Sequence, residues 1–464
     1  MTLLGAKVAA ARAVGELARR AGRGGGTSLP GKVLMALEPG AIAELAARLP
    51  RGSVVISATN GKTTTAAMVA SVLRHAGIPA VHNRAGANMA GGVASTLLAA
   101  ARGGGRIDGE LGLFEIDEFW LDRVTPELHP RGILLGNLFR DQLDRYGELE
   151  TIADRWAAVA ASTDARLVLN ADDPLIADLG RDAPGLTYFG IEDPSVAIPE
   201  MQHASDSKHC RRCGAAYVYD AVYLGHLGRY RCPSCGQERP TPSIAAERIE
   251  LDGTRRSRFE LTTPAGTATV ELPLPGLYNV YNALGAASLC LELDVPLTAV
   301  VAGLRDVQAA FGRAERITIG DIELQVLLIK NPAGANEILR TLVLEHEELD
   351  VLAILNDRVA DGRDVSWVWD ADFEMLAGRV RRVTCAGTRA AELAVRLKYA
   401  GVPSDRLHVT PAPAAALDEA VADVGSGHLY VLPTYTALLE LRQELAARGH
   451  AVQFWEPAAA VGGR

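Results

Sequence analysis

Short apolar runs alternate with polar loops and amphipathic stretches along most of this chain. A run rich in β-branched residues that ends in a polar loop and a helical stretch is typical of a parallel strand followed by a helix. We therefore predict an α/β fold with helices on both faces of parallel sheets. The predicted strands are Val54–Ser57, Leu111–Ile116, Gly132–Leu135, Leu167–Leu169, Leu324–Ile329, Val351–Leu355, Val380–Cys385, His408–Val409 and His428–Leu432.

The same pattern divides the chain. Residues 1–50 are predicted to be a helical segment that precedes the first strand, and residues 51–312 a central domain. The rhythm breaks near residue 190, so residues 203–240 are expected to be a small insertion with a hairpin. A hinge is expected at Phe311–Arg316, and residues 313–464 are predicted to form a C-terminal, Rossmann-like α/β domain.

Composition narrows the class of protein. With 464 residues, 48% of them hydrophobic and 22% charged, the chain suits two or three domains with cores of their own. A net charge of −9 argues against general nucleic-acid binding. No apolar run reaches the length of a membrane span. The basic first 23 residues are interpreted as an amphipathic helix, and weak contact with an anionic membrane surface stays open as an alternative.

A phosphate-binding loop is predicted where the strand Val54–Ser57 ends, because a helical stretch follows the loop directly. Backbone amides and the positive end of that helix would face the phosphates. Lys62 is expected to reach the β- and γ-phosphates of ATP, and the hydroxyl of Thr63 or Thr64 to help hold Mg²⁺. An ordinary strand–helix turn is the alternative. The loop residues are Thr59, Asn60, Gly61, Lys62, Thr63 and Thr64.

Three acidic residues follow the strand that begins at Leu111. Glu115, Asp117 and Glu118 come at its carboxyl end, which is the edge where α/β sheets bind ligands. Carboxylates beside bound phosphates are natural Mg²⁺ ligands, so Glu115 is predicted to hold Mg²⁺ with Thr63. The alternative is an acidic turn exposed to solvent.

Four of the six cysteines form two Cys-x-x-Cys pairs separated by eighteen residues. Four thiolates complete a tetrahedral shell around zinc and leave no open position, which indicates a structural site. Two disulfides are the alternative and would suit a secreted protein. The predicted zinc ligands are Cys210, Cys213, Cys232 and Cys235. Cys290 and Cys385 are expected to be buried small hydrophobes.

Taken together, these motifs resemble the Mur ligase family, ATP-dependent enzymes that form amide bonds on peptidoglycan precursors. The resemblance covers the whole chain in the family's order. It implies a central ATP-binding domain with a phosphate loop, in which Lys62 and Glu115 serve catalysis and Asn170, Asp173, Asn282 and Arg313 also bind the nucleotide. The motifs are Thr59–Thr64, Asn83–Asn88, Glu115, Asn137–Gly147, Asn170–Pro174, Gly276–Asn282 and Arg313–Glu315.

Several departures from the usual pattern, the cysteine pairs and the stretch Asn356–Asp370 resemble one branch of that family. This branch comprises the synthetase subunits of lipid II isoglutaminyl synthases. The departures are Ala58 for a glycine, Gln142 and Tyr278 where histidines are common, and Lys330–Gly334 in place of an Asp-Tyr-Ala-His-Asn-Pro-like segment.

The branch implies amidation of the α-carboxyl of D-glutamate in the lipid II stem peptide, through an acyl phosphate. It also implies a GatD-like glutaminase partner that supplies ammonia, and a cytoplasmic chain at the inner face of the membrane. An aspartate of this chain would complete the partner's Cys-His pair, with Asp364 expected first, Asp361 second and Asp357 third. Trp367 and Trp369 beside these acids suit a protein interface, although core tryptophans and an acid-capped helix remain an alternative.

Two other functions compete with amidation. A stand-alone ligase would join an amino acid to a cell-wall precursor without a partner. A non-catalytic scaffold would use the nucleotide only to set domain closure. Its inserted zinc ribbon (residues 203–240, which contain the four paired cysteines) and the tryptophans would then bind proteins. We expect the ribbon mainly to brace the central domain.

Overall fold

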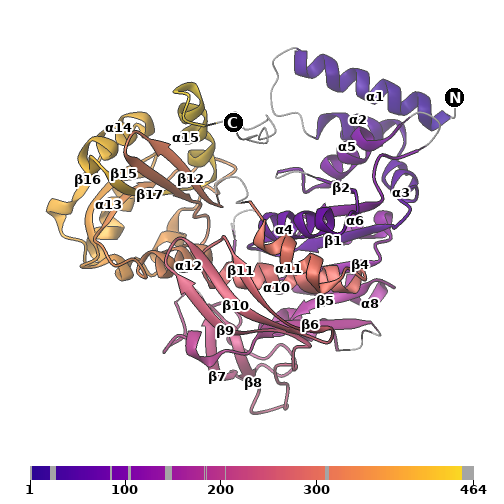
Figure 1. Cartoon of the computed structure of the whole chain (residues 1–464), viewed down its shortest axis with the longest axis horizontal. Helices are drawn as coiled ribbons and strands as arrows, with labels where there is room; N and C mark the ends of the chain where they lie inside the picture. Colours follow the sequence, from indigo (N-terminus) through magenta and orange to yellow (C-terminus); the bar gives the residue numbers. More distant parts are fainter. Residues whose placement is uncertain are drawn as a thin grey trace.

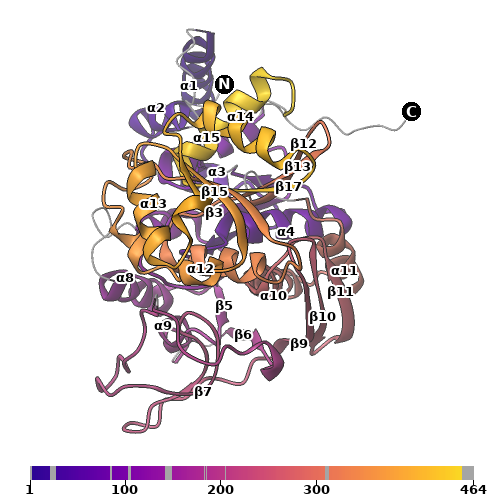
Figure 2. The ribbon, with the colours of Figure 1, turned by 90° about the vertical axis from the view of Figure 1, so that its left-hand side faces the viewer.

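The computed structural model describes residues 3–20, 28–83, 86–102, 106–141, 149–181, 183, 185–203, 205–308 and 313–451. Two large sheets organise these residues, one in the central part of the chain and one in the C-terminal part (Figure 1). Figures 1 and 2 both place helix α1 at one end of the molecule and strand β7 at the opposite end.

In the described residues, the larger sheet contains nine strands in the order β11-β10-β9-β6-β5-β4-β1-β3-β2. The strands from β2 to β9 run parallel, and β10 and β11 are antiparallel to their neighbours. Every residue of β1, β3 and β4 is buried, as continuous apolar runs in a parallel sheet require. The strands are β1 (Ser53–Ser57), β2 (Ala80–His82), β3 (Leu111–Glu115), β4 (Gly132–Leu135), β5 (Arg166–Asn170), β6 (Leu186–Ile191), β9 (Ile244–Asp252), β10 (Arg256–Thr263) and β11 (Gly266–Leu272).

Helices cover both faces of this sheet. Val54 and Ile56 of β1 pack into one core with α4 (Lys62–His75), α10 (Leu277–Glu292) and α11 (Leu297–Arg305). Val55 points the other way, into a second core. That core contains residues of α1 (Leu3–Arg20), α2 (Leu29–Leu37), α3 (Ala41–Ala46), α5 (Ala90–Ala100), α6 (Leu121–Leu128), α8 (Leu149–Ser162) and α9 (Pro174–Asp178). The alternation along β1 therefore separates the two helical layers.

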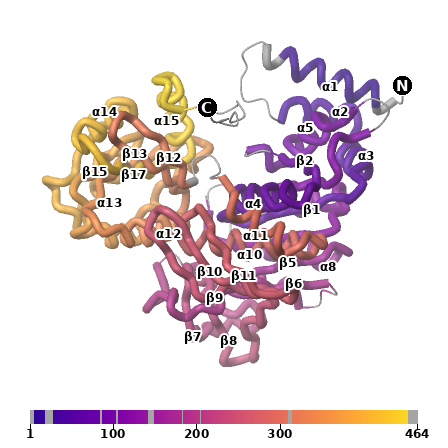
Figure 3. The backbone as a smooth tube through the Cα atoms, viewed as in Figure 1, coloured from indigo at the N-terminus to yellow at the C-terminus, as the bar shows by residue number. Residues whose placement is uncertain are grey.

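An insertion connects β6 to β9. It contains the short 3₁₀ helix η2 (Pro194–Val196) and the antiparallel hairpin of β7 (Val218–Leu224) and β8 (Leu227–Arg231). Figure 3 shows the hairpin below the larger sheet, and the backbone then returns through β9, β10 and β11 to α10. The predicted hairpin is thus confirmed, with longer strands than expected.

The smaller sheet has the order β12-β13-β17-β14-β15-β16, and all pairs except β12 with β13 are parallel. Residues 313–316 of the expected hinge lie in β12, where they pair with β13. The elements are β12 (Arg313–Ile319), β13 (Ile322–Leu327), α12 (Pro332–Leu342), β14 (Leu349–Ile354), η3 (Ser366–Trp369), η4 (Phe373–Leu376), β15 (Val380–Ala386), α13 (Ala390–Tyr399), η5 (Ser404–Arg406), β16 (Leu407–Val409), α14 (Pro413–Val424), β17 (Gly427–Pro433) and α15 (Tyr435–Ala447).

No helix within the described residues is long and apolar enough to cross a membrane. Cys290 and Cys385 are fully buried, as expected for small core residues.

Trp156 offers a test of the helical layer behind β3. Its ring is fully buried and its Nε1 donates to the carbonyl oxygen of Glu118 at 3.0 Å. Replacing it with alanine should cost about 3–5 kcal/mol of stability, because a large cavity and an unpaired carbonyl result. Trp369, which is 53% exposed, is the matched control and should cost about 1 kcal/mol or less. Urea unfolding followed by circular dichroism measures both, and equal losses would contradict the assigned burial.

Candidate active site

The loop between β1 and α4 has a backbone that only glycine suits at position 61. Gly61 has φ +88°, and a Cβ atom there would lie 2.0 Å from Oδ1 of Asn282. The close approach brings α10 against the loop, while α4 begins at the next residue, Lys62. The amides at the start of α4 therefore face the space above the loop, as phosphate binding requires.

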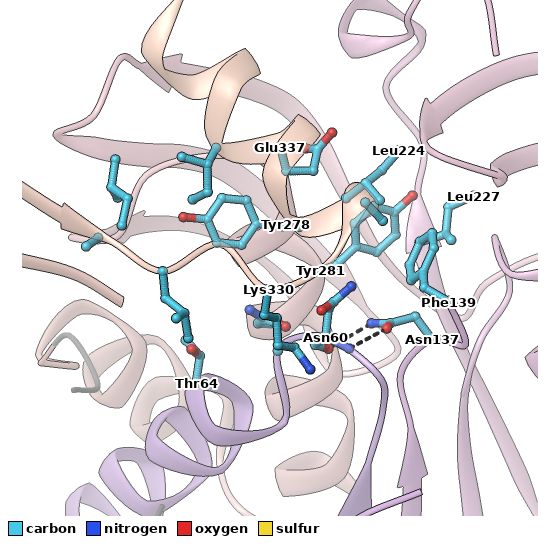
Figure 4. Close-up of a pocket in the computed structure, with 18 residues that line it drawn as sticks. Asn60, Thr64, Asn137, Phe139, Leu224, Leu227, Tyr278, Tyr281, Lys330 and Glu337 are labelled. Atoms are coloured by element: carbon cyan, nitrogen blue, oxygen red, sulfur yellow. Dashed lines mark hydrogen bonds between the residues drawn. The ribbon is translucent and has the colours of Figure 1, made fainter. Parts of the chain in front are cut away.

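The loop is held from the neighbouring strand by the segment after β4. Asn60 N donates to Oδ1 of Asn137 at 2.9 Å, and Asn137 Nδ2 donates back to the Asn60 carbonyl at 3.0 Å (Figure 4). Phe139 N donates to Oγ1 of Thr59 at 3.0 Å. Thr59 and Asn60 thus set the shape of the loop through both their backbone and their side chains.

Lys62 lies in a buried ion pair. Its Nζ donates to Oε2 of Glu118 at 2.7 Å, and less than a tenth of either side chain is exposed. Burial would lower the pKa of Lys62, but the carboxylates of Glu118, Asp117 and Glu115 raise it above its ordinary value. Burial would likewise raise the pKa of Glu118, and Lys62 and Lys330 lower it instead. Lys62 is therefore a fixed positive charge beside the loop.

The predicted Mg²⁺ ligands lie side by side. Thr63 Oγ1 donates to Oε1 of Glu115 at 3.0 Å. The buried amide of Asn83 holds the backbone of Glu115 in both directions, with Nδ2 donating to its carbonyl at 2.7 Å and Oδ1 accepting from its N–H at 2.8 Å. A hydroxyl and a carboxylate at the start of a helix suit Mg²⁺, which prefers oxygen ligands. Of the two threonines considered, Thr63 is the one whose hydroxyl is seen to bond to Glu115, and Thr64 lines the pocket described next.

The three acidic residues are not a solvated turn. Glu115, Asp117 and Glu118 are each less than a tenth exposed. Burial, and then the charge of Glu118, raise the pKa of Asp117. The solvated alternative is therefore wrong for this cluster.

A pocket with about 820 Å³ of empty space, part of it open to solvent, lies over the loop between the two sheets. Its apolar walls and few polar groups above the phosphate loop suit a nucleotide. Figure 4 shows Phe139, Tyr281, Leu224 and Leu227 on one side, with Asn60 and Lys330 nearer its centre. Its lining comprises Asn60, Gly61, Thr64, Asn137, Phe139, Leu224, Leu227, Tyr278, Tyr281, Asn282, Ala314, Leu327, Leu328, Lys330, Ala333, Gly334, Glu337 and Ile338.

The remaining predicted nucleotide residues differ in position. Asn282 lies in the pocket, and its Oδ1 accepts from the hydroxyl of Thr65 at 3.3 Å. Asn170 and Asp173 are buried and hold loops: Asn170 Nδ2 donates to the Gly136 carbonyl, and Asp173 caps α9. Neither is among the described residues that line the pocket, so their contact with the nucleotide stays a prediction. The side chain of Arg313, like residues 142–148 of the Asn137–Gly147 motif, lies outside the described part of the chain.

Lys330 is a candidate site residue that the sequence analysis did not predict. Its Nζ donates to Oδ2 of Asp141 at 2.5 Å and to the Thr59 carbonyl at 3.2 Å. The next residue, Asn331, donates from Nδ2 to Oδ1 of Asn60 at 3.0 Å and also caps α12. The signal for it was a lysine between a strand end and an Asn-Pro helix start, which directs the side chain toward the ligand edge of the C-terminal sheet.

A second, smaller pocket adjoins the first through Lys330 and contains two of the three candidate aspartates. Asp364 is exposed on its wall and accepts from the N–H of Ser366 at 2.8 Å. Asp361 is 6% exposed, and it accepts hydrogen bonds from the amide and hydroxyl of Thr436. Asp357 pairs with Arg389 at 2.8 Å. The pocket is lined by Arg140, Asp141, Lys330, Asn331, Pro332, Asp361, Asp364, Ser366, Trp367 and Asp370.

The four paired cysteines come together as a metal site would require. Their sulfur atoms all lie within 4.8 Å of one another. Cys210 and Cys235 are 3.5 Å apart, and Cys213 and Cys232 are 3.4 Å apart. A tetrahedron with Zn–S bonds of about 2.3 Å separates its sulfurs by about 3.8 Å, so the thiols fit zinc. Matching backbone bonds, Cys210 N to Ala215 O and Cys232 N to Gln237 O, give the two turns the same shape.

The sequence matches two family descriptions, the Mur ligase middle domain over residues 56–230 and the MurT ligase C-terminal domain over residues 328–438. It is 32% identical to the subunit MurT of lipid II isoglutaminyl synthase (glutamine-hydrolyzing) from Streptococcus pneumoniae, over 92% of this chain and 93% of that protein. The corresponding subunit from Staphylococcus aureus is also 32% identical, over 93% and 96%.

The fold is similar to two solved ligases. A pseudomurein peptide ligase type C from Methanothermus fervidus gives a TM-score of 0.66 at 21% identity, covering 87% of this chain and 80% of that one. MurF from Thermotoga maritima in complex with ADP gives 0.62 at 13% identity, covering 90% and 85%.

A phosphate loop on a parallel sheet, closed by a second α/β unit, is the architecture of the Mur ligases, a family of ATP-dependent ligases. Within that class the match extends along nearly the whole chain to one branch. The protein belongs to the MurT family of Mur ligases.

Substitution of Glu115 by glutamine tests the metal ligand. The neutral amide should raise the Mg²⁺ concentration needed for half-maximal binding of an ATP analogue by at least about tenfold. Glu110→Gln, just before the opposite end of the same strand and half exposed, is the matched control and should leave it unchanged. Titration calorimetry at several Mg²⁺ concentrations measures the effect. Equal Mg²⁺ dependence in both variants would rule out Glu115 as a ligand.

Proposed function

We propose that the protein is the synthetase subunit of a lipid II isoglutaminyl synthase. The reaction would convert the α-carboxyl of D-glutamate in the lipid II stem peptide to an amide, at the expense of ATP. The nearly full-length similarity to the MurT subunits of such enzymes supports the reaction class. The position of Lys330 supports it independently, because this residue joins the nucleotide pocket to the second pocket.

The chemistry fits these two adjoining spaces. A carboxylate oxygen attacks the γ-phosphorus of ATP, and ADP leaves, which gives an acyl phosphate. The nitrogen of ammonia then attacks the carbonyl carbon, phosphate leaves, and the nitrogen loses a proton. Such transfers depend on positioning and on neutralising charge.

The charged residues described above would act in these two reaction steps. Lys62 would turn from Glu118 to the phosphates, and Lys330 would stabilise charge on the transferred phosphoryl group from the opposite side. Thr63 and Glu115 would hold Mg²⁺, which would supply positive charge and reduce the repulsion between ATP and the buried acids. The cysteine cluster would hold a structural zinc.

We further propose that ammonia comes from a GatD-like glutaminase subunit that docks on the C-terminal domain. The large apolar side chains exposed on that domain include Trp369 at 53%, Val395 at 47% and Tyr399 at 75%. The rings of Trp369 and Tyr399 lie 6.0 Å apart, so they form one surface. Exposed aromatic residues are enriched in protein interfaces.

Asp364 remains the first choice for the aspartate that serves the partner's active site. It is exposed and lines the second pocket with Trp367, whereas Asp361 is buried and has both oxygens engaged by Thr436. Asp357 is the second choice on this geometry, although Arg389 pairs with it. The second pocket would then lead ammonia from Asp364 toward Lys330.

A lipid-linked substrate would bring the chain to the inner face of the membrane. Helix α1 supports such a peripheral contact, because Val14 and Leu17 are exposed on it and basic residues follow.

The direct test is amidation of lipid II by the purified chain with ATP and Mg²⁺. One reaction receives ammonium chloride, another glutamine, and a third glutamine with the partner subunit. We expect product in the first and third, detected by mass spectrometry as exchange of a hydroxyl for an amine. Failure of all three while ATP is hydrolysed would exclude amidation and favour a ligase that adds an amino acid. A chain without ATP turnover under any condition would favour a scaffold.

Substitution of Asp364 by asparagine separates ammonia supply from synthesis. Glutamine-dependent amidation by the complex should fall about a hundredfold or more, because the partner's histidine loses its orienting carboxylate. Ammonium-dependent amidation should stay within about twofold of wild type. Asp370→Asn is the matched control, since it removes the same charge from the same pocket. Equal loss with both nitrogen sources would show that Asp364 acts in synthesis instead.

A further inference from the structure

The turn of the cysteine-bearing insertion forms part of the wall of the nucleotide pocket. Leu224 ends β7 and Leu227 begins β8, and they are 5% and 1% exposed. Both line the pocket beside Phe139 and Tyr281 (Figure 4). This apolar side suits the base of a nucleotide, because the phosphate loop with Asn60 and Gly61 supplies the polar side.

The turn itself is fixed tightly against the central domain. Gly225 has φ +56°, and a Cβ atom there would lie 2.8 Å from the ring of Phe139. The ring of His226 is fully buried, with its centroid 4.6 Å from that of Phe139. Gly225 N also donates to Oε1 of Gln202 at 2.8 Å. Movement of the insertion would therefore move the pocket wall.

A second connection passes through a buried ion pair. Arg239 follows the second cysteine turn, and its Nε donates to Oδ1 of Asp172 at 2.5 Å. Oδ2 of the same carboxylate accepts from the hydroxyl of Tyr281 at 2.7 Å. Asp172 is fully buried, so its charge depends on Arg239. The insertion thus also orients the aromatic ring of Tyr281, which lies beside Leu224 in the pocket wall.

The C-terminal domain contacts the same hairpin. Arg340 of α12 donates from Nη1 to the Tyr223 carbonyl at 2.6 Å and pairs with the buried Glu337 at 3.0 Å. Glu337 lines the pocket as well. The hairpin turn is therefore clamped between both domains at the place where they enclose the nucleotide.

Around the cysteines the packing is slight. The local core consists of Ala177, Cys210, Tyr217, Tyr230 and Cys232. So small a core needs its metal in order to hold one shape. Leu224 and Leu227 lie in the hairpin of β7 and β8. Strand β7 begins shortly after the first pair of cysteines, and β8 ends next to the second pair.

We propose that the zinc ribbon contributes to the affinity for ATP. Leu224 and Leu227 form part of the wall that contacts the base of ATP, and zinc at the four cysteines holds that wall in place. Leu224 and Leu227 act by contact, and Arg239 is a positioning residue that acts through Asp172 and Tyr281. The inference rests on the proposed binding of ATP and adds a role for the insertion beyond support of the central domain.

The experiment compares binding of a non-hydrolysable ATP analogue with binding of tripolyphosphate, both with Mg²⁺, by titration calorimetry. Leu227→Ala and Leu224→Ala should each raise the Kd for the ATP analogue about tenfold, as lost apolar contact in a pocket does. Neither should change the Kd for tripolyphosphate, which has no base. Val218→Ala is the matched control, because it lies in the same hairpin but is 39% exposed and remote from the turn.

Zinc removal by a chelator forms the second arm. The zinc-depleted chain should lose affinity for the ATP analogue at least as strongly as Leu227→Ala, keep its affinity for tripolyphosphate, and recover when zinc is restored. Circular dichroism reports whether it stays folded; if it unfolds, the leucine variants alone decide. ATP-analogue binding unchanged by both leucine substitutions would overturn the inference. A wild-type chain that bound neither ligand would instead contradict the proposed function.

Discussion

Four asparagines around one turn determine how this site is assembled. Asn60 lies in the phosphate loop, Asn137 follows β4, Asn282 lies in α10, and Asn331 begins α12 of the C-terminal domain. An asparagine side chain both donates and accepts, so each can bond to another asparagine or to the backbone without adding charge. Asn137 and Asn331 bond to Asn60 of the loop, and Asn282 packs against Gly61. Uncharged side chains therefore hold the loop beside the charged residues of the site.

The charged residues of the site come from both domains. The buried acids Glu115, Asp117 and Glu118 lie on one side of the loop with Lys62 among them, and Lys330 approaches from the other domain. Charges interact strongly in a region of low dielectric, so the gain or loss of one positive group there would change the electrostatic potential of the site. Because Lys330 belongs to the C-terminal domain, the electrostatic environment of the phosphates depends on how the two domains meet. A change in how the two domains meet would therefore also change the positive charge near the phosphates.

Much of this architecture could be predicted from the chain because local patterns carry it. The apolar run Val54–Ser57 before the Gly-Lys-Thr loop correctly predicted the strand and the loop that follows it. The spacing of Cys210 to Cys235 correctly predicted that the four thiols come together. Strand β9 was missed because Ile244–Asp252 contains alanines and charges that interrupt the apolar pattern, although turn residues flank it on both sides; its pairing with β6 and β10 makes it a strand. The contacts of Lys330 and Leu227 could not be predicted, since both join segments distant in sequence; for Lys330 the sequence offers only its place between a strand end and a helix start.

The position of the ribbon within the sheet has a topological consequence. Strands β6 and β9 are adjacent and parallel, so the chain must travel back along the full length of a strand before it can form the second of them. In most α/β proteins a helix makes this crossover; here residues 192–243 make it, and the cysteine-bearing insertion with its hairpin is part of the connection. Excision of the ribbon would therefore break the chain path itself. A shortened version of this protein would need a crossover of about a dozen residues or more in its place, to join β6 to the three strands β9, β10 and β11 that complete the sheet.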